Sequence, residues 1–117
     1  MTPAIFYLIT LTAYTACPLQ TDSTPTITAS LQTVRPGIVA LSRDLERKHK
    51  LKFGDYVLIK GRGIFEFQDR MHRRKSQQVD VFKWNKGEAL KIGRKPALVA
   101  FIKRGKVSFK KLTKGLF

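Results

Sequence analysis

Six short runs of β-branched and aromatic residues, each bounded by turn residues, limit the folds open to this chain more than any other feature. They cover Ile5–Tyr14, Gly37–Leu41, Tyr56–Lys60, Ile64–Asp69, Gln78–Phe82 and Ala97–Ile102. Runs of this composition predict strands. Two further stretches, Ser42–His49 and Lys86–Ile92, predict short helices, with Ser42 as a candidate N-cap of the first and Gly93 closing the second. Six strands with two short helices and no long βαβ repeat predict a small mostly-β barrel.

Chain length and composition set the size of this domain. With 117 residues, of which 43% are hydrophobic, the chain can bury one core and has little room for a second. The last predicted strand ends at Ile102, so we expect the barrel domain to cover residues 1–102. Residues 103–117 hold six basic and no acidic residues and form a predicted basic C-terminal extension.

The charge of the chain predicts an anionic partner. The sequence has 23 Lys and Arg against 8 Asp and Glu, which gives a formal net charge of +15. Residues 1–40 contribute one cation and one anion, so the whole excess lies in residues 41–117. Such a surface attracts anionic polymers over long distances, in a salt-dependent way. Nucleic acid ranks low among the anionic candidates, because no nucleic-acid-binding motif appears.

Other residue types exclude several classes of protein. One cysteine, Cys17, excludes an internal disulfide framework, and with His49 and His72 as the only histidines we predict neither a metal centre nor a cofactor. We expect Cys17 to fill a small buried space and both histidines to lie on the surface. Trp84 and Phe82 are expected in the core rather than stacked on a sugar. No apolar run reaches the roughly 20 residues that cross a bilayer, so we predict no transmembrane segment.

Three of the eight carboxylates stand at positions that need a reason. Asp44 follows the second predicted strand, Asp69 ends the fourth, and Asp80 lies inside the fifth, although Asp is a poor strand former. Because strand side chains alternate, Val79 and Val81 share one face and Asp80 takes the other. If the valines pack on the core, Asp80 looks into a groove or solvent. An exposed Asp80 paired with a nearby arginine is the simpler alternative.

A series of segments follows a specific order along the chain. The series comprises Thr12–Ala16, Gly37–Leu41 followed by Asp44, Phe53–Gly61, Gly63–Asp69, Asp80 eleven positions after Asp69, and Ala89 and Gly93 before Ala97–Ile102. Over residues 10–102 the chain thereby resembles the 3D domain, which is named for three aspartates and is related to the MltA-type lytic transglycosylases and RlpA-like barrels. The resemblance implies a double-psi β-barrel whose aspartates gather in a groove and act on the glycan strands of peptidoglycan.

The resemblance also implies a role for each site residue. Asp80 matches the catalytic aspartate, which protonates the glycosidic oxygen between N-acetylmuramic acid and N-acetylglucosamine and then takes a proton from the muramoyl C6 hydroxyl, leaving a 1,6-anhydro end. Asp69 would raise the pKa of Asp80 or orient the sugar, and Asp44 would orient the sugar or hold the fold. Tyr14 and Thr15 border the groove and would contact the sugar. We expect Asp69 and Asp80 to come from adjacent strands and to meet in one cleft.

Two observations keep other interpretations open. The loop Arg70–Ser76 lacks the glycine turn usual in the resembled family, which favours a non-catalytic barrel that binds glycan or protein. Cations of this loop would also lower the pKa of Asp80 if they reached it.

The run Ala4–Ile9 has no preceding Lys or Arg and predicts a strand rather than a secretory signal. A wall-cleaving enzyme of this kind would act in the cell envelope after release during lysis, as a phage-encoded lysis or virion protein does.

Overall fold

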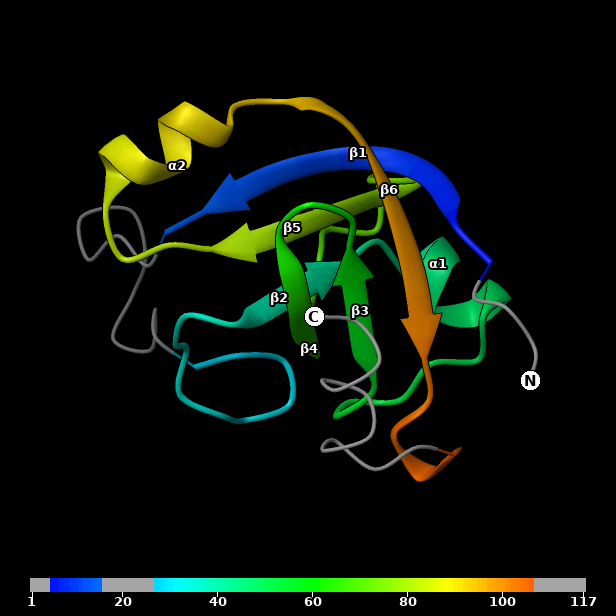
Figure 1. Ribbon diagram of the computed structural model, residues 1–117. Coiled ribbons are helices and arrows are strands. Elements are labelled where there is room, and N and C mark those ends of the chain that lie inside the picture. The colour runs from blue at the N-terminus through cyan, green and yellow to red at the C-terminus, as the bar shows by residue number, and fades with distance from the viewer. Residues whose placement is uncertain (1–4, 16–26, 107–117) are drawn as a thin grey trace.

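The computed structural model describes residues 5–15 and 27–106 of the chain (Figure 1). Six strands form one closed barrel in the order β1-β5-β2-β4-β3-β6, with two short helices outside it. The predicted small mostly-β barrel with two short helices is therefore confirmed. The elements are β1 (Tyr7–Tyr14), β2 (Ile38–Leu41), α1 (Arg43–Lys48), β3 (Tyr56–Ile59), β4 (Gly63–Arg70), β5 (Gln78–Phe82), α2 (Lys86–Ile92), β6 (Lys95–Ile102) and the 3₁₀ turn η1 (Arg104–Lys106).

Alternating apolar residues line the inside of the barrel. Leu11 in β1, Val39 and Leu41 in β2, and Val79 and Val81 in β5 are buried in one core cluster. Their spacing of two residues sends the side chains between them to the outer face. Burial of the inner side chains against one another supplies the main favourable part of the folding free energy. The outer face is thereby left for other side chains.

Strand pairing closes the barrel and contains one irregularity. The pairs β1–β5 and β2–β4 are parallel, and the other four pairs are antiparallel. The β2–β4 register shifts between Val39 and Ala40, so that Val39 lies opposite Phe67 while Ala40 lies opposite Asp69. A bulge re-aims the side chains that follow it. In a regular strand Asp69, two residues after Phe67, would point to the same face as Phe67, which is buried in the core. The shift instead turns Asp69 to the outer face.

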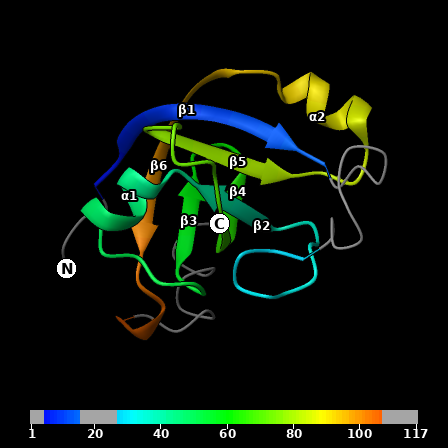
Figure 2. The same ribbon diagram turned by 180° about the vertical axis from the view of Figure 1, so that it is seen from behind.

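The ends of β1 and β5 extend side by side away from the centre of the barrel (Figures 1 and 2). Helix α2 packs against β1 on one side of these ends. On the other side lies the loop 27–36, which a bridge between Ile27 and Thr33 closes (Figure 1). The two strand ends are therefore flanked by a helix and a loop.

Predicted and observed boundaries agree to within two residues for every strand. Ser42 has the extended backbone of an N-cap but makes no capping hydrogen bond; its hydroxyl instead accepts the Gln78 N–H at 3.0 Å and ties α1 to β5. Gly93 closes α2 as predicted, with a φ of 62°.

No helix among the described residues is long and apolar enough to cross a membrane. Cys17 and residues 107–117 of the predicted extension lie outside the described residues, and the division at residue 102 stays a prediction.

Two side chains lie elsewhere than predicted. His49 was expected on the surface but packs half-buried between Tyr7 and Phe101, with both ring centroids 4.5 Å from its own. Trp84 was expected in the core but is 61% exposed, whereas Phe82 is buried as predicted. Trp84 follows the end of β5, where the chain leaves the barrel, so it has no position on the inner face.

Candidate active site

Four strands bring one residue each into a row on the outer face of the sheet. Thr12 of β1 lies opposite Asp80 of β5. Ala40 of β2 lies between the two aspartates, opposite Asp80 on one side and Asp69 of β4 on the other. Residues directly opposite on paired strands point to the same face. We call these four residues the aspartate row. The two carboxylates share a face as expected, but β2 separates their strands, so the predicted adjacency is wrong.

Asp80 faces outward because Val79 and Val81 point into the core, as their alternation predicts. Its Oδ1 accepts a hydrogen bond from Thr12 Oγ1 at 2.8 Å, and the same Thr12 oxygen accepts one from Gln78 Nε2 at 2.9 Å. Neither ion pair found among the described residues includes Asp80. The alternative of a surface aspartate paired with an arginine is therefore wrong.

Burial is the largest influence on Asp80 and raises the pKa of its carboxyl to about 6. The Thr12 hydrogen bond and the positive charge of Lys75 oppose this shift because both favour the carboxylate, whereas the negative charge of Asp69 adds to it. A cation of the Arg70–Ser76 loop thus acts in the predicted direction without cancelling the effect of burial. An acid with this pKa keeps its proton in part of the molecules near neutral pH, as a general acid must.

Asp69 is held by three hydrogen bonds. The Tyr14 hydroxyl donates to its Oδ2 at 3.3 Å, and the backbone N–H groups of Ala29 and Arg70 donate to its Oδ1, both at 2.9 Å. Since Ala29 belongs to the loop 27–36, this carboxylate ties the loop to the barrel. The Arg70 side chain turns instead to Glu46, with contacts of 2.7 and 2.8 Å. The negative charge of Asp69 is therefore fixed in place within the row.

Asp44 takes no part in the aspartate row. It lies in the first turn of α1, and its Oδ2 accepts the backbone N–H of Gln77 at 2.9 Å. Desolvation raises the pKa of Asp44, but hydrogen bonds from the Ser42 hydroxyl and from backbone N–H groups together bring the pKa below its usual value. Of its two predicted roles, holding the fold is the one this geometry supports, because the bond fixes the residue just before β5.

A hollow of about 460 Å³ opens beside the aspartate row, between β1 and α2. Its lining includes the predicted pair Tyr14 and Thr15, and the full set is Thr12, Ala13, Tyr14, Thr15, Lys86, Ala89, Leu90 and Gly93. Thr12 belongs to both the hollow and the aspartate row, and its hydroxyl contacts Asp80, while the Tyr14 hydroxyl reaches from the hollow to Asp69. Burial, with the charges of both aspartates, raises the pKa of Tyr14, so its hydroxyl stays protonated as a donor.

Three aromatic rings continue from this hollow along the end of β5. The centroids of Tyr14 and Phe82 are 5.5 Å apart and those of Phe82 and Trp84 are 4.9 Å apart, both pairs edge to face. Phe82 is buried and supports the exposed indole of Trp84. A rigid aromatic face open to solvent suits stacking against the apolar side of a sugar ring.

Thr12 and Ala40 lie at the site although the sequence analysis assigned them no role. The two-residue spacing of Thr12 and Tyr14 was a usable signal, since it puts both on one face of a strand. Ala40 gave no signal, because its position depends on the strand order. Within residues 5–15 and 27–106, no three His, Cys, Asp or Glu side chains group closely enough to hold a metal ion.

The site thus combines one carboxyl with a raised pKa, a second carboxylate on the same face, and a neighbouring open hollow. Thr12 and Tyr14 line this hollow but neither Asp69 nor Asp80 does, so the two aspartates do not meet in it as predicted. Thr12, which lines the hollow and contacts Asp80, connects the two, and a carboxyl with a raised pKa has the property that general acid–base chemistry requires. In comparisons with known proteins, no family model matches the chain and no curated protein matches it in sequence.

Proposed function

We propose that the protein is a peptidoglycan lytic transglycosylase of the 3D-domain type, with a double-psi barrel and Asp80 as its acid and base. The observation that carries this proposal is the state of Asp80: an outward-facing carboxyl whose burial raises its pKa to about 6. Glycoside hydrolysis ordinarily uses two carboxylates. Transglycosylation within the sugar needs one, because the substrate supplies its own nucleophile.

The reaction proceeds in two proton transfers at the Asp80 carboxyl. The protonated carboxyl gives its proton to the glycosidic oxygen as the bond from muramoyl C1 to that oxygen breaks. The resulting carboxylate takes the proton of the muramoyl C6 hydroxyl, whose oxygen bonds to C1. The products are a free N-acetylglucosamine hydroxyl and a 1,6-anhydro-muramoyl end, and Asp80 is again protonated.

The neighbouring residues support this cycle. Thr12 holds Oδ1 of Asp80 at 2.8 Å and so fixes the direction of the carboxyl. Asp69 supplies a negative charge that favours the protonated form. The hollow beside β1 and the indole of Trp84 offer a place for the flanking sugars. The net charge of +15 would concentrate the protein on anionic wall polymers, in the cell envelope, including after phage-driven lysis.

The test is digestion of purified sacculi followed by mass spectrometry of the released glycan ends. We expect muramoyl ends that are one water lighter than hydrolysed ends. Asp80→Asn keeps the shape of the side chain and can accept the Thr12 hydrogen bond, but it cannot give a proton. We expect it to lower release by about 10² to 10⁴ fold, the usual size of a general acid–base contribution.

Glu88→Gln is the matched control, since it removes an exposed carboxylate of α2 that does not line the hollow. Circular dichroism checks that each variant is folded. Full release by Asp80→Asn would remove Asp80 from the mechanism. Ends that carry the extra water would mean hydrolysis, and binding to sacculi without any release would mean the non-catalytic barrel.

A further inference from the structure

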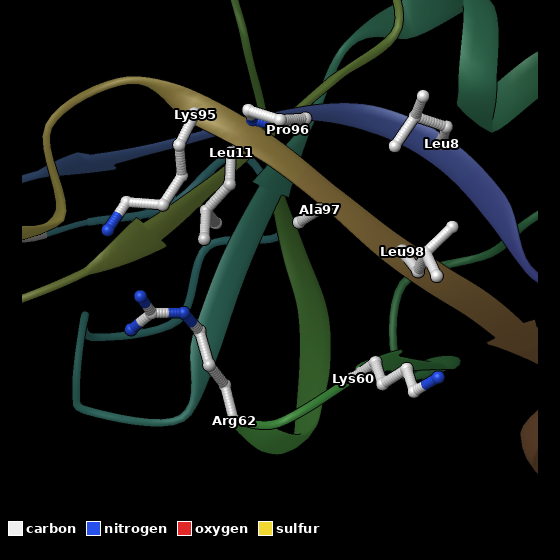
Figure 3. Close-up of a pocket in the computed structure, with 8 residues that line it drawn as sticks. All are labelled: Leu8, Leu11, Lys60, Arg62, Lys95, Pro96, Ala97 and Leu98. Atoms are coloured by element: carbon white, nitrogen blue, oxygen red, sulfur yellow. The ribbon is translucent and has the colours of Figure 1, made fainter.

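A second hollow, of about 330 Å³, opens between β1, β6 and the turn that joins β3 to β4 (Figure 3). Lys60 and Arg62 of the turn, Lys95 of β6, and Leu8 and Leu98 are among its lining residues. The two leucines are cross-strand partners. The backbone N–H of Lys60 donates to the carbonyl of Leu98 at 2.9 Å, which fixes the turn against the apolar pair. We call this surface the cationic hollow.

Within the part of the chain that the structure describes, the three cations of the hollow form no ion pair. Both ion pairs of the described residues are made by other arginines, Arg35 and Arg70. Figure 3 shows the Arg62 and Lys95 side chains extending toward one end of the hollow, with the two leucines at the other. Unpaired cations that converge on one space favour an anion between them, and a phosphate group suits both guanidinium and ammonium donors.

The two exposed leucines of the hollow indicate which class of anionic partner fits it. Leu8 is 67% exposed and Leu98 37%, and both line the same hollow as the cations, at the end opposite Arg62 and Lys95. A soluble polyanion would use the cations and leave both leucines in water. A nucleic acid would use aromatic rings for stacking, and no lining residue of the hollow is aromatic. A membrane surface presents phosphates and acyl chains together, which matches cations beside exposed leucines.

We propose that the cationic hollow docks the protein on the surface of an anionic phospholipid membrane. Lipid phosphates bind Arg62 and Lys95, while Leu8 and Leu98 enter the boundary between headgroups and acyl chains. In the ring of six strands β6 lies opposite β2 and β3 lies opposite β5, so a docked barrel holds the strands of Ala40 and Asp80 on the side away from the bilayer. The docking does not depend on the activity proposed above.

The experiment is co-sedimentation of the full chain with vesicles of equal parts phosphatidylcholine and phosphatidylglycerol, and with vesicles of phosphatidylcholine alone. We expect binding to the anionic vesicles only. The double variant Arg62→Gln with Lys95→Gln should weaken binding to the anionic vesicles about 30-fold, because each lost cation weakens it about fivefold. The matched control removes two charges of α2, Lys86→Gln with Lys91→Gln, and should retain most of the binding.

Leu8→Ser with Leu98→Ser separates a membrane from a soluble phosphate polymer. We expect this pair to weaken vesicle binding about tenfold or more and to leave polyphosphate binding unchanged. Circular dichroism monitors folding, and Leu8→Ser alone serves if the pair does not fold.

The proposal is overturned if the α2 control loses as much vesicle binding as the hollow variant, which would mean diffuse charge. It is also overturned if the leucine variants bind vesicles like the parent, which would mean recognition of phosphate without the bilayer. Tighter binding to a single-stranded oligonucleotide than to vesicles, lost in the same variants, would assign the hollow to nucleic acid.

Discussion

The charged side chains on the two sides of the barrel differ in how they are held. On the side of β5, β2 and β4, the two aspartates are each fixed by hydrogen bonds, and burial shifts the pKa of Asp80. On the side of β3 and β6, Arg62 and Lys95 line an open hollow, and no carboxylate of residues 5–15 or 27–106 pairs with them. Fixed, desolvated charge suits selective chemistry at one atom. Unpaired, exposed charge suits attraction to an extended anionic surface, which needs no single geometry.

The largest effect that distinguishes the two sides should be the pH dependence of stability at Asp80. Its pKa rises from 3.8 to about 6 on folding, so the native state binds the proton more tightly than the unfolded chain. The stability from this group is full below about pH 4 and is lost as pH rises through 6, by up to about 3 kcal/mol. Asp80→Asn should remove this loss.

Urea unfolding of both proteins across this pH range checks the prediction. The difference in the free energy of unfolding, variant minus parent, should grow in favour of the variant between pH 4 and pH 6 and then level off. Subtracting the two curves cancels the other titrating groups. A difference that is constant with pH would show that Asp80 titrates as it does in the unfolded chain.

A smaller effect should follow from removing the hydrogen bond to Asp80. Thr12→Val takes away a donor that favours the carboxylate, so the pKa of Asp80 should rise further, by about one unit. The titration of the Asp80 carboxyl carbon by NMR measures it. Thr10→Val is the control, two residues earlier on the same face of β1, and should leave that pKa in place. A fall in the pKa of Asp80 on Thr12→Val would contradict the described geometry.

The smallest effect is expected on the other side of the barrel. Arg62→Gln with Lys95→Gln removes two cations without an ion-pair partner among the described residues, so the free energy of unfolding should change by less than about 0.5 kcal/mol. Urea unfolding at neutral pH is the measurement. A clear destabilisation would mean that these side chains hold the fold, and the contrast between the two sides would weaken.

Local patterns of the sequence predicted the strands and the outward direction of Asp80. Both depend on alternation within a few residues, as between Val79 and Val81. The sequence did not predict that β2 lies between the strands of the two aspartates. Strand order depends on contacts between distant segments, such as Thr12 with Asp80 at a separation of 68 residues, which no local pattern encodes.

The aspartate row also depends on a feature that alternation cannot predict. The register shift at Val39 and Ala40 brings Asp69 opposite Ala40, and a regular ladder would not. Asp44 was expected to orient the sugar or hold the fold because it matches the first aspartate in the ordered segments of the resembled family. Its contact with Gln77, which supports the second role, forms only in the folded loop.

Because the aspartate row draws on four strands, it forms only when all four have been synthesised and have folded together. Its first member comes from β1 and its last from β5, and β1 is also bound by β6. A nascent chain on the ribosome that still lacks β5 and β6 has no proton donor beside Thr12 and no closed ring to hold it. The surroundings of Asp80 are therefore complete only after translation has passed residue 102, where β6 ends.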